Sequence, residues 1–155
     1  MVLAGVHDKP GHLIRRCQQI AVALFLERCA EFALTPPQYA LLRTVAAEPG
    51  IDQITLGGRA ALDRSSTARL CAALEGRGLL ARVPDPADRR ALLLSLTVAG
   101  AELLAAAEPA VMAVQEALLA PLEPAAREAF LAALLVLVRT HNARSRAPLV
   151  DVADG

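Results

Sequence analysis

Aromatic residues are scarce in this sequence. Phe, Tyr and Trp together make up 3% of the 155 residues, with no Trp and one Tyr. The core must then be built mainly from Leu, Ala and Val, which favours packed helices. Apolar residues nevertheless make up 55% of the sequence. That share is high for a soluble monomer, so we expect a second subunit to cover some helix faces. The length suits one domain.

Cysteine is also sparse. Cys17, Cys29 and Cys71 are an odd number and lack metal-ligand spacing, so the sequence predicts neither a disulfide scaffold nor a zinc site. We expect all three to be small core residues. We also expect no cofactor and no bound metal.

Catalytic and targeting signals are missing as well. His7, His12 and His141 lie in separate segments, and neither a G-x-S-x-G motif nor a P-loop occurs. We therefore expect the protein not to be an enzyme. The N-terminus lacks the pattern of a signal peptide, and no long apolar stretch is free of charge. These features predict a cytoplasmic protein without a membrane partner.

The formal net charge is zero, which taken alone argues against a nucleic-acid partner. The distribution of charge is uneven, however. Residues 59–90 carry seven basic and four acidic side chains, a net charge of +3, and the remainder carries −3. The members of this segment are Arg59, Arg64, Arg69, Arg77, Arg82, Arg89 and Arg90 with Asp63, Glu75, Asp85 and Asp88. The local excess permits a basic surface on a neutral protein.

Apolar periodicity and capping signals predict a mostly helical chain. We expect helices over 10–32, 36–47, 56–62 with Thr55 as cap, 64–76 with Asp63 as cap, 97–120 and 124–144, and a short strand over 51–54. Pro109 should kink or split the helix that contains it. The last helix is apolar nearly all round, so we expect it to be buried on two sides. The tail after Arg146 looks loose.

The stretch over 63–97 organises the rest. Two short apolar runs, LLARV and ALLLSL, flank the charged turn PDPADRR and predict a hairpin with a basic tip. A helix that follows a helix and precedes such a hairpin is a winged helix-turn-helix. The fold class is therefore mainly α with a small β-wing, with flanking dimerisation helices.

The same stretch suits duplex DNA. Small hydroxyls and an arginine on the first turns of a helix can read base edges in the major groove, here Ser65, Ser66, Thr67 and Arg69. Arg89 and Arg90 stand at the hairpin tip beside Asp85 and Asp88, where a carboxylate can orient an arginine for the narrow minor groove. An ordinary capped helix and a solvated charged turn are the alternatives.

The segments LTPPQYALLRTV and DRSSTARLCAALEGRGLLARVPDPADRRALLLSLTVAG resemble the MarR family of bacterial winged-helix transcriptional regulators. The resemblance implies one MarR-like domain over 1–155, with a DNA-binding lobe over 34–97 and dimerisation helices over 10–32 and 98–145. It implies a homodimer on a pseudo-palindromic operator in double-stranded DNA. By position, Ser65, Ser66, Thr67 and Arg69 match the base-reading helix, Arg90 the wing arginine, Asp88 its orienting partner and Arg82 a phosphate contact.

The run GHLIRRCQQIAVALFLE is similar to a subgroup of that family that represses the catabolism of aromatic or heteroaromatic acids. The resemblance thus implies a repressor released by a small aromatic carboxylate. Five residues are candidates for binding this effector: His12, Arg16, Gln19, Tyr39 and Arg43. Two alternatives stay open, a peroxide sensor acting through Cys17 and a winged-helix protein-interaction module that does not bind DNA.

Overall fold

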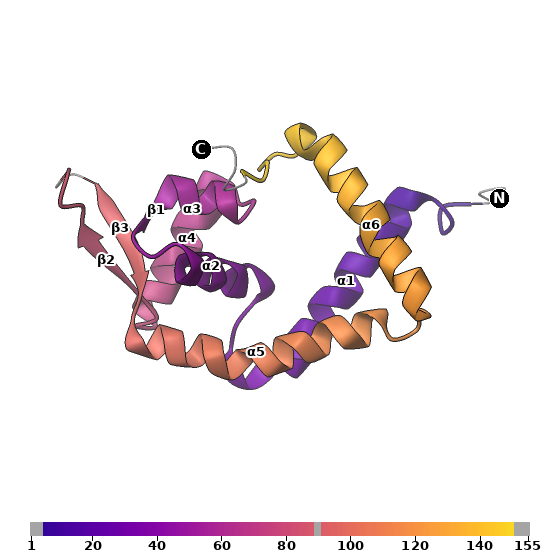
Figure 1. Ribbon diagram of the computed structural model, residues 1–155, viewed down its shortest axis with the longest axis horizontal. Coiled ribbons are helices and arrows are strands. Elements are labelled where there is room, and N and C mark those ends of the chain that lie inside the picture. The colour runs from indigo at the N-terminus through magenta and orange to yellow at the C-terminus, as the bar shows by residue number, and fades with distance from the viewer. Residues whose placement is uncertain (1–4, 89–90, 151–155) are drawn as a thin grey trace.

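A computed structural model describes residues 5–88 and 91–150 of the chain. Its helices and strands form an open, elongated arrangement (Figure 1), in which one long helix, α5 (Val98–Leu119), runs along one edge. A lobe of three helices and a small sheet lies at one end of α5, and the first and last long helices lie at the other. The predicted fold class, mainly α with a small β-wing, is confirmed.

The first helix, α1 (Pro10–Arg28), is shorter than predicted. The amide of Cys29 still donates to the carbonyl of Phe25, at 2.8 Å, but a 3-10 turn, η1 (Ala30–Phe32), follows. The next residue, Ala33, has a φ of 48° in the left-handed region, which no α-helix continues through. The predicted helix over 10–32 is therefore wrong in its last turn.

The second helix, α2 (Pro36–Ala47), begins as predicted. Thr35 and Gln38 form a capping box, in which the Thr35 amide donates to Gln38 Oε1 at 2.9 Å. Pro36 sits in the first turn, where the missing amide proton costs nothing. Leu41, Leu42 and Val45 on the inner face of this helix are fully buried.

The predicted strand over 51–54 is confirmed only for its first two residues, and the predicted cap at Thr55 is wrong. Only β1 (Ile51–Asp52) is a strand, and α3 (Gln53–Arg59) begins immediately after it. Asp52 caps this helix, because its Oδ1 accepts from the amides of Ile54 and Thr55 at 2.9 and 3.0 Å. Burial opposes ionisation of this carboxyl, yet these hydrogen bonds and one from the Thr55 hydroxyl lower the pKa of Asp52.

The remaining elements of the lobe are α4 (Arg64–Gly76), β2 (Leu80–Pro84) and β3 (Leu92–Leu96). The two long strands pair antiparallel with Leu80 opposite Leu96, and β1 pairs with the other edge of β3, which gives the order β1-β3-β2. Buried leucines from every part of the lobe meet in its core. They include Leu42 of α2, Leu56 of α3, Leu74 of α4 and Leu94 of β3.

The long helix α5 joins this core to the rest of the chain. It is long and apolar enough to cross a membrane by length and composition alone. Leu104, Ala107, Val111 and Val114 are nevertheless buried in the core of the chain, so α5 serves here as a core helix.

Pro109 does not split α5, because one helix spans 98 to 119. A kink at Pro109 stays a prediction. Pro109 removes the donor for the carbonyl of Ala105. Both residues lie on the exposed face, where water can satisfy that carbonyl.

The last long helix, α6 (Pro124–His141), is followed by a 3-10 turn, η2 (Asn142–Arg144). The prediction that α6 is buried on two sides is wrong for the single chain, since none of its residues is buried. Its exposed apolar side chains include Phe130, Leu131, Leu135 and Val138. An apolar groove of about 290 Å³ lies between α6, α1 and the end of α5.

Candidate nucleic-acid interface

Asp63 fixes the start of α4. Its Oδ1 accepts from the amide of Ser66 and its Oδ2 from the hydroxyl of Ser66, each at 2.9 Å. These two bonds lower the pKa of Asp63, with a smaller contribution from the nearby guanidinium of Arg146. The cap predicted from the sequence is therefore confirmed. It holds the first turn of α4, which carries the candidate base-reading residues.

The two faces of α4 differ in chemistry. Thr67, Cys71 and Leu74, spaced at helical period, are fully buried. Ser65 and Arg69 lie on the exposed face, with the small side chain of Ala72 one turn further on. Within the described part of the chain, the guanidinium of Arg69 makes no ion pair. A face of small side chains with an available arginine can approach base edges closely.

Two of the four predicted base-reading residues have structural partners. Thr67 is fully buried and its hydroxyl donates to the carbonyl of Asp63 at 2.9 Å. The prediction that Thr67 reads bases is wrong, because the helical period puts it on the core side together with Cys71. Ser66 is half-buried, and its hydroxyl is the donor to Asp63.

Thr67 instead marks a place where α3 and α4 approach closely. A Cβ added to Gly57 of α3 would lie 2.8 Å from the Thr67 hydroxyl and 3.2 Å from the carbonyl of Leu62. Gly57 thus lets the two helices of the helix-turn-helix touch. The other end of α4 is held by Arg77, whose guanidinium donates to the carbonyls of Ala33 and Phe32 at 2.7 and 2.9 Å.

Arg64 was missed as a site residue. It is exposed at the first position of α4 and, within the described residues, forms no ion pair. The signal was present in the sequence, because the first residue after an N-cap stands beside the residues expected to meet DNA. We add Arg64 to the candidate set as a backbone contact.

An ion pair made by Arg82 connects the hairpin β2–β3 to α4. The Nε atom of Arg82 lies 2.7 Å from Glu75 Oε1, and both side chains are 28% exposed. The ion pair connects the middle of β2 to α4. Arg82 remains open to solvent on one side, so its proposed phosphate contact stays a prediction.

One backbone hydrogen bond and one bond to a side chain shape the turn at the wing tip. The amide of Ala91 donates to the carbonyl of Asp88, and the amide of Ala87 donates to the Asp85 carboxylate at 2.8 Å. Asp88 is exposed. Arg89 and Arg90, the predicted tip arginines, lie outside the described residues, and their roles stay predictions.

The five candidate effector residues come from two helices, α1 and α2. His12, Arg16 and Gln19 lie on α1, where Arg16 donates to Gln19 Oε1 at 2.9 Å. On the same helix, His12 Nδ1 lies 3.4 Å from Arg15 Nη2. Tyr39 and Arg43 lie on α2, one helical turn apart. Their grouping into one effector site stays a prediction.

Tyr39 is bound to α5. Its hydroxyl donates to Glu108 Oε2 at 2.6 Å, and its ring stands 6.0 Å from the ring of Phe25. Burial and the neighbouring Glu108 carboxylate together raise the pKa of Tyr39 to about 12. The phenol is therefore neutral at pH 7 and acts as a hydrogen-bond donor.

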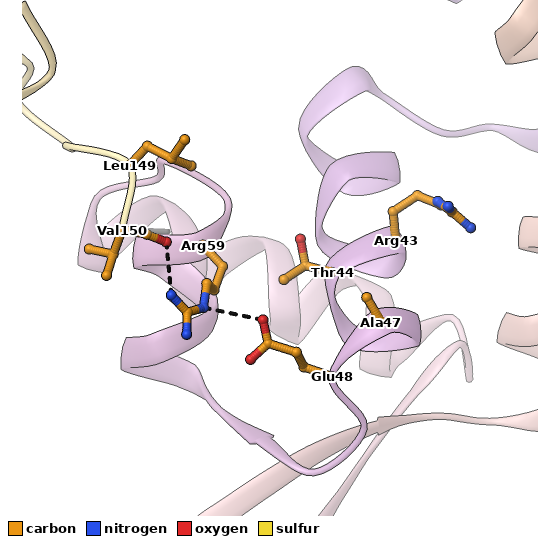
Figure 2. A pocket seen from close by; sticks show the side chains of 7 residues that line it. All are labelled: Arg43, Thr44, Ala47, Glu48, Arg59, Leu149 and Val150. Carbon is orange, nitrogen blue, oxygen red and sulfur yellow. Dashed lines mark hydrogen bonds and ion pairs between the residues drawn. The ribbon is translucent and has the colours of Figure 1, made fainter. Parts of the chain in front are cut away.

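Arg43 borders two cavities. One, of about 390 Å³, lies between α2 and α5 and is also lined by Leu104 and Glu108. The other, of about 360 Å³, lies between the end of α2 and α3 and is lined by Arg43, Thr44, Ala47, Glu48, Arg59, Leu149 and Val150 (Figure 2). In this second cavity Arg59 faces Glu48, with 3.2 Å between Nε and Oε1, whereas the Arg43 guanidinium points away. Of the two, the cavity beside α5 combines Arg43 with the Glu108 carboxylate and the apolar side chain of Leu104.

The cysteines differ from one another. Cys29 and Cys71 are buried, and burial raises the pKa of each thiol. Cys17 is exposed on α1 and lines the apolar groove beside Phe130 and Leu134. The expectation that Cys17 is a core residue is therefore wrong for the single chain.

A capped recognition helix with an exposed polar face, packed against a second short helix and followed by a β-hairpin, defines a winged helix-turn-helix DNA-binding protein. The family model described as "MarR family" matches residues 34–92, which span α2 to the start of β3. The chain belongs to the MarR family of transcriptional regulators.

Individual relatives support this assignment. The transcriptional regulator HosA of Escherichia coli O111:H- is 36% identical over 127 residues, covering 82% of this chain and 93% of HosA. The repressor CouR, solved on a 23-mer DNA duplex, is 30% identical with a TM-score of 0.82, over 89% of this chain and 98% of CouR. BpsR of Bordetella bronchiseptica, solved to explain how 6-hydroxynicotinic acid regulates its DNA binding, is 28% identical with a TM-score of 0.81, over 86% of this chain and 96% of BpsR.

Proposed function

We propose that the protein is a cytoplasmic repressor that binds a pseudo-palindromic operator as a homodimer and releases it when a small aromatic carboxylate binds. The observation that carries this proposal is the exposed face of α4, where Arg64, Ser65 and Arg69 lie on the first two turns of a helix whose start is fixed by Asp63. The wing supplies the second contact, with Arg90 entering the minor groove and Asp88 orienting it. No enzymatic role is proposed.

The homodimer is supported by the apolar surface of α1 and α6. Leu13 and Ile14 of α1 and Phe130 and Leu135 of α6 are exposed large apolar residues. Figure 1 shows α6 at the end of the molecule away from the wing. A second copy packed against these helices would bury them. Two α4 helices would then stand about one duplex turn apart on the operator.

An aromatic acid as effector is supported by the relative BpsR, whose DNA binding 6-hydroxynicotinic acid regulates. In this chain, the cavity between α2 and α5 offers Arg43 beside the apolar side chain of Leu104. Arginine pairs with a carboxylate, and apolar walls suit an aromatic ring. Release requires the acid to bind the DNA-incompetent dimer more tightly than the DNA-bound one.

The two alternatives have weaker support. Peroxide sensing through Cys17 needs groups that activate its thiol, whereas Tyr39, the one tyrosine, is bonded to Glu108. A protein-interaction module without DNA binding would leave the exposed arginines of α4 unexplained. Salt dependence separates this second alternative from the proposal, because phosphate contacts make log K fall with log salt.

The wing gives a first test. Arg90→Ala is expected to weaken binding to the operator by about 1 to 3 kcal/mol, because the variant has no guanidinium to place in the narrow minor groove. A gel-shift titration measures the change. Arg28→Ala serves as control, since Arg28 is exposed on α1 and carries the same charge. Equal affinities of both variants and the wild type would refute the assignment of the wing.

The effector gives a second test. Adding 6-hydroxynicotinic acid or a hydroxybenzoate to the protein–operator complex is expected to release the DNA, measured by fluorescence anisotropy. The matching amides, which lack the carboxylate charge, should leave the complex intact, as should the acids on an Arg43→Ala variant. Release by the amides as readily as by the acids would contradict a carboxylate effector.

A further inference from the structure

The end of the described chain returns to the helix-turn-helix. After η2, residues 145–150, which we call the strap, run from the end of α6 to α3 (Figure 1). The expectation of a loose tail after Arg146 is thus wrong for this segment. Hydrogen bonds and an ion pair hold the strap against η2, α3 and the start of α4.

Asn142 closes the strap into a loop. Its Nδ2 donates to the carbonyl of Leu149 and its Oδ1 accepts from the amide of Leu149, each at 2.8 Å. Inside the loop, the Ala147 amide donates to the Ser145 hydroxyl at 3.2 Å. The amide side chain of Asn142 thereby satisfies both backbone groups of Leu149, so the path of the strap is defined by η2 itself.

Val150 docks the strap on α3. Its amide donates to the carbonyl of Gly58 at 2.9 Å, and its carbonyl accepts from the Arg59 guanidinium at 3.1 Å (Figure 2). A Cβ added to Gly58 would lie 3.1 Å from Val150 Cγ2, so the glycine leaves room for the valine. Arg59 also pairs with Glu48, which connects the strap to the end of α2.

Arg146 brings the strap to the start of α4. Its guanidinium lies 3.1 Å from Asp63 Oδ2, with the Arg146 side chain 88% exposed. A pair this exposed adds little to folding stability. Its effect on the surface is larger, because it puts a second guanidinium near that of Arg64 and offsets the carboxylate of Asp63. Arg64 and Arg146 line the same cavity of about 350 Å³.

We propose that the strap is part of the DNA interface and that Arg146 contacts the phosphate backbone next to the first turn of α4. The inference rests on the proposed DNA-binding function of α4. Because the backbone of the strap is held by hydrogen bonds, Arg146 stays next to the start of α4, where a guanidinium can pair with phosphate oxygens through two donors. The contact adds affinity without adding sequence preference.

Binding of Arg146→Ala to the operator, measured by anisotropy over a range of salt concentrations, tests this. We expect affinity to fall roughly tenfold at low salt and equally for all duplexes. The slope of log K against log salt should become shallower by about 0.9 for each phosphate that the variant no longer neutralises. Arg144→Ala is the matched control, since Arg144 is exposed, lies two residues away and precedes the strap. It should bind like the wild type.

Asn142→Ala tests whether the position of the strap matters when the charge of Arg146 is kept. It keeps every arginine but removes both bonds to Leu149, so we expect it to weaken binding in the same direction as Arg146→Ala. Arg69→Ala is the reference for the interface itself. If Arg69→Ala weakens binding while Arg146→Ala binds as tightly as the wild type or more tightly, the strap is not part of the interface. The proposed interface on α4 then still stands. If neither variant changes affinity, the proposed interface on α4 fails too.

Discussion

Replacing Arg69 by alanine is expected to weaken specific binding by about 1 to 3 kcal/mol per subunit and to relax the preference for one base pair. Arg69 stands on the exposed face of α4, one turn after Ser65. Its rigid, planar fork of donors matches O6 and N7 of guanine. The neighbouring side chains on this face, Ser65 and Ala72, are too short to make that bidentate contact in its place.

The measurement compares wild type and Arg69→Ala on the operator and on duplexes with single base-pair substitutions. A base contact makes the variant indifferent to one substitution that the wild type rejects. Uniform weakening on every duplex would show that Arg69 binds phosphate and would contradict its role in reading bases. Arg28→Ala again controls for the removal of one charge.

Gly100→Ala is expected to destabilise the fold by about 3 kcal/mol, roughly 6 to 12 °C in Tm. Gly100 lies buried in the first turn of α5, where Thr97 caps the helix through the Gly100 amide at 3.0 Å. A Cβ at this position would stand 2.1 Å from the carbonyl oxygen of Leu79. Because the obstacle is backbone, no rotamer change relieves the clash, and α5 must move away from the wing.

Gly76→Ala is the matched control for this prediction. Gly76 ends α4, is exposed, and has nothing within 4 Å of an added Cβ. Alanine favours a helix over glycine, so stability should stay the same or rise slightly. Thermal unfolding of both variants at one protein concentration measures the difference, since dimer stability depends on concentration. Equal Tm values for the two variants would contradict the close packing of α5 against Leu79.

Local signals predicted the elements that carry function. The N-cap at Asp63, the apolar period of α4 and the two apolar runs of the wing are each encoded within a few neighbouring residues. The buried position of Thr67 was also encoded locally, since it shares a helical face with Cys71 and Leu74. Its hydroxyl alone suits base reading, but the helical phase places that hydroxyl on the core side.

Other features depend on tertiary structure. Asp52 looks like a strand residue between two isoleucines, but its carboxylate caps α3 once the chain turns there. Proline usually interrupts a helix because it lacks an amide proton, but Pro109 is exposed, so water can hydrogen-bond the carbonyl that it leaves without a donor. The strap has no periodic pattern, and its contact with Asp63 joins residues 83 positions apart, so no local pattern in the sequence predicts Arg146 as a site residue.

The most direct test of DNA recognition by two α4 helices is a selection of binding sites by the full-length protein from a library of random duplexes. We predict enrichment of one motif made of two inverted half-sites with centres about one helical turn apart. The wild-type protein should bind that motif with log K falling steeply as log salt rises. Recovery of no motif, or of a single half-site without its inverted partner, would contradict the account.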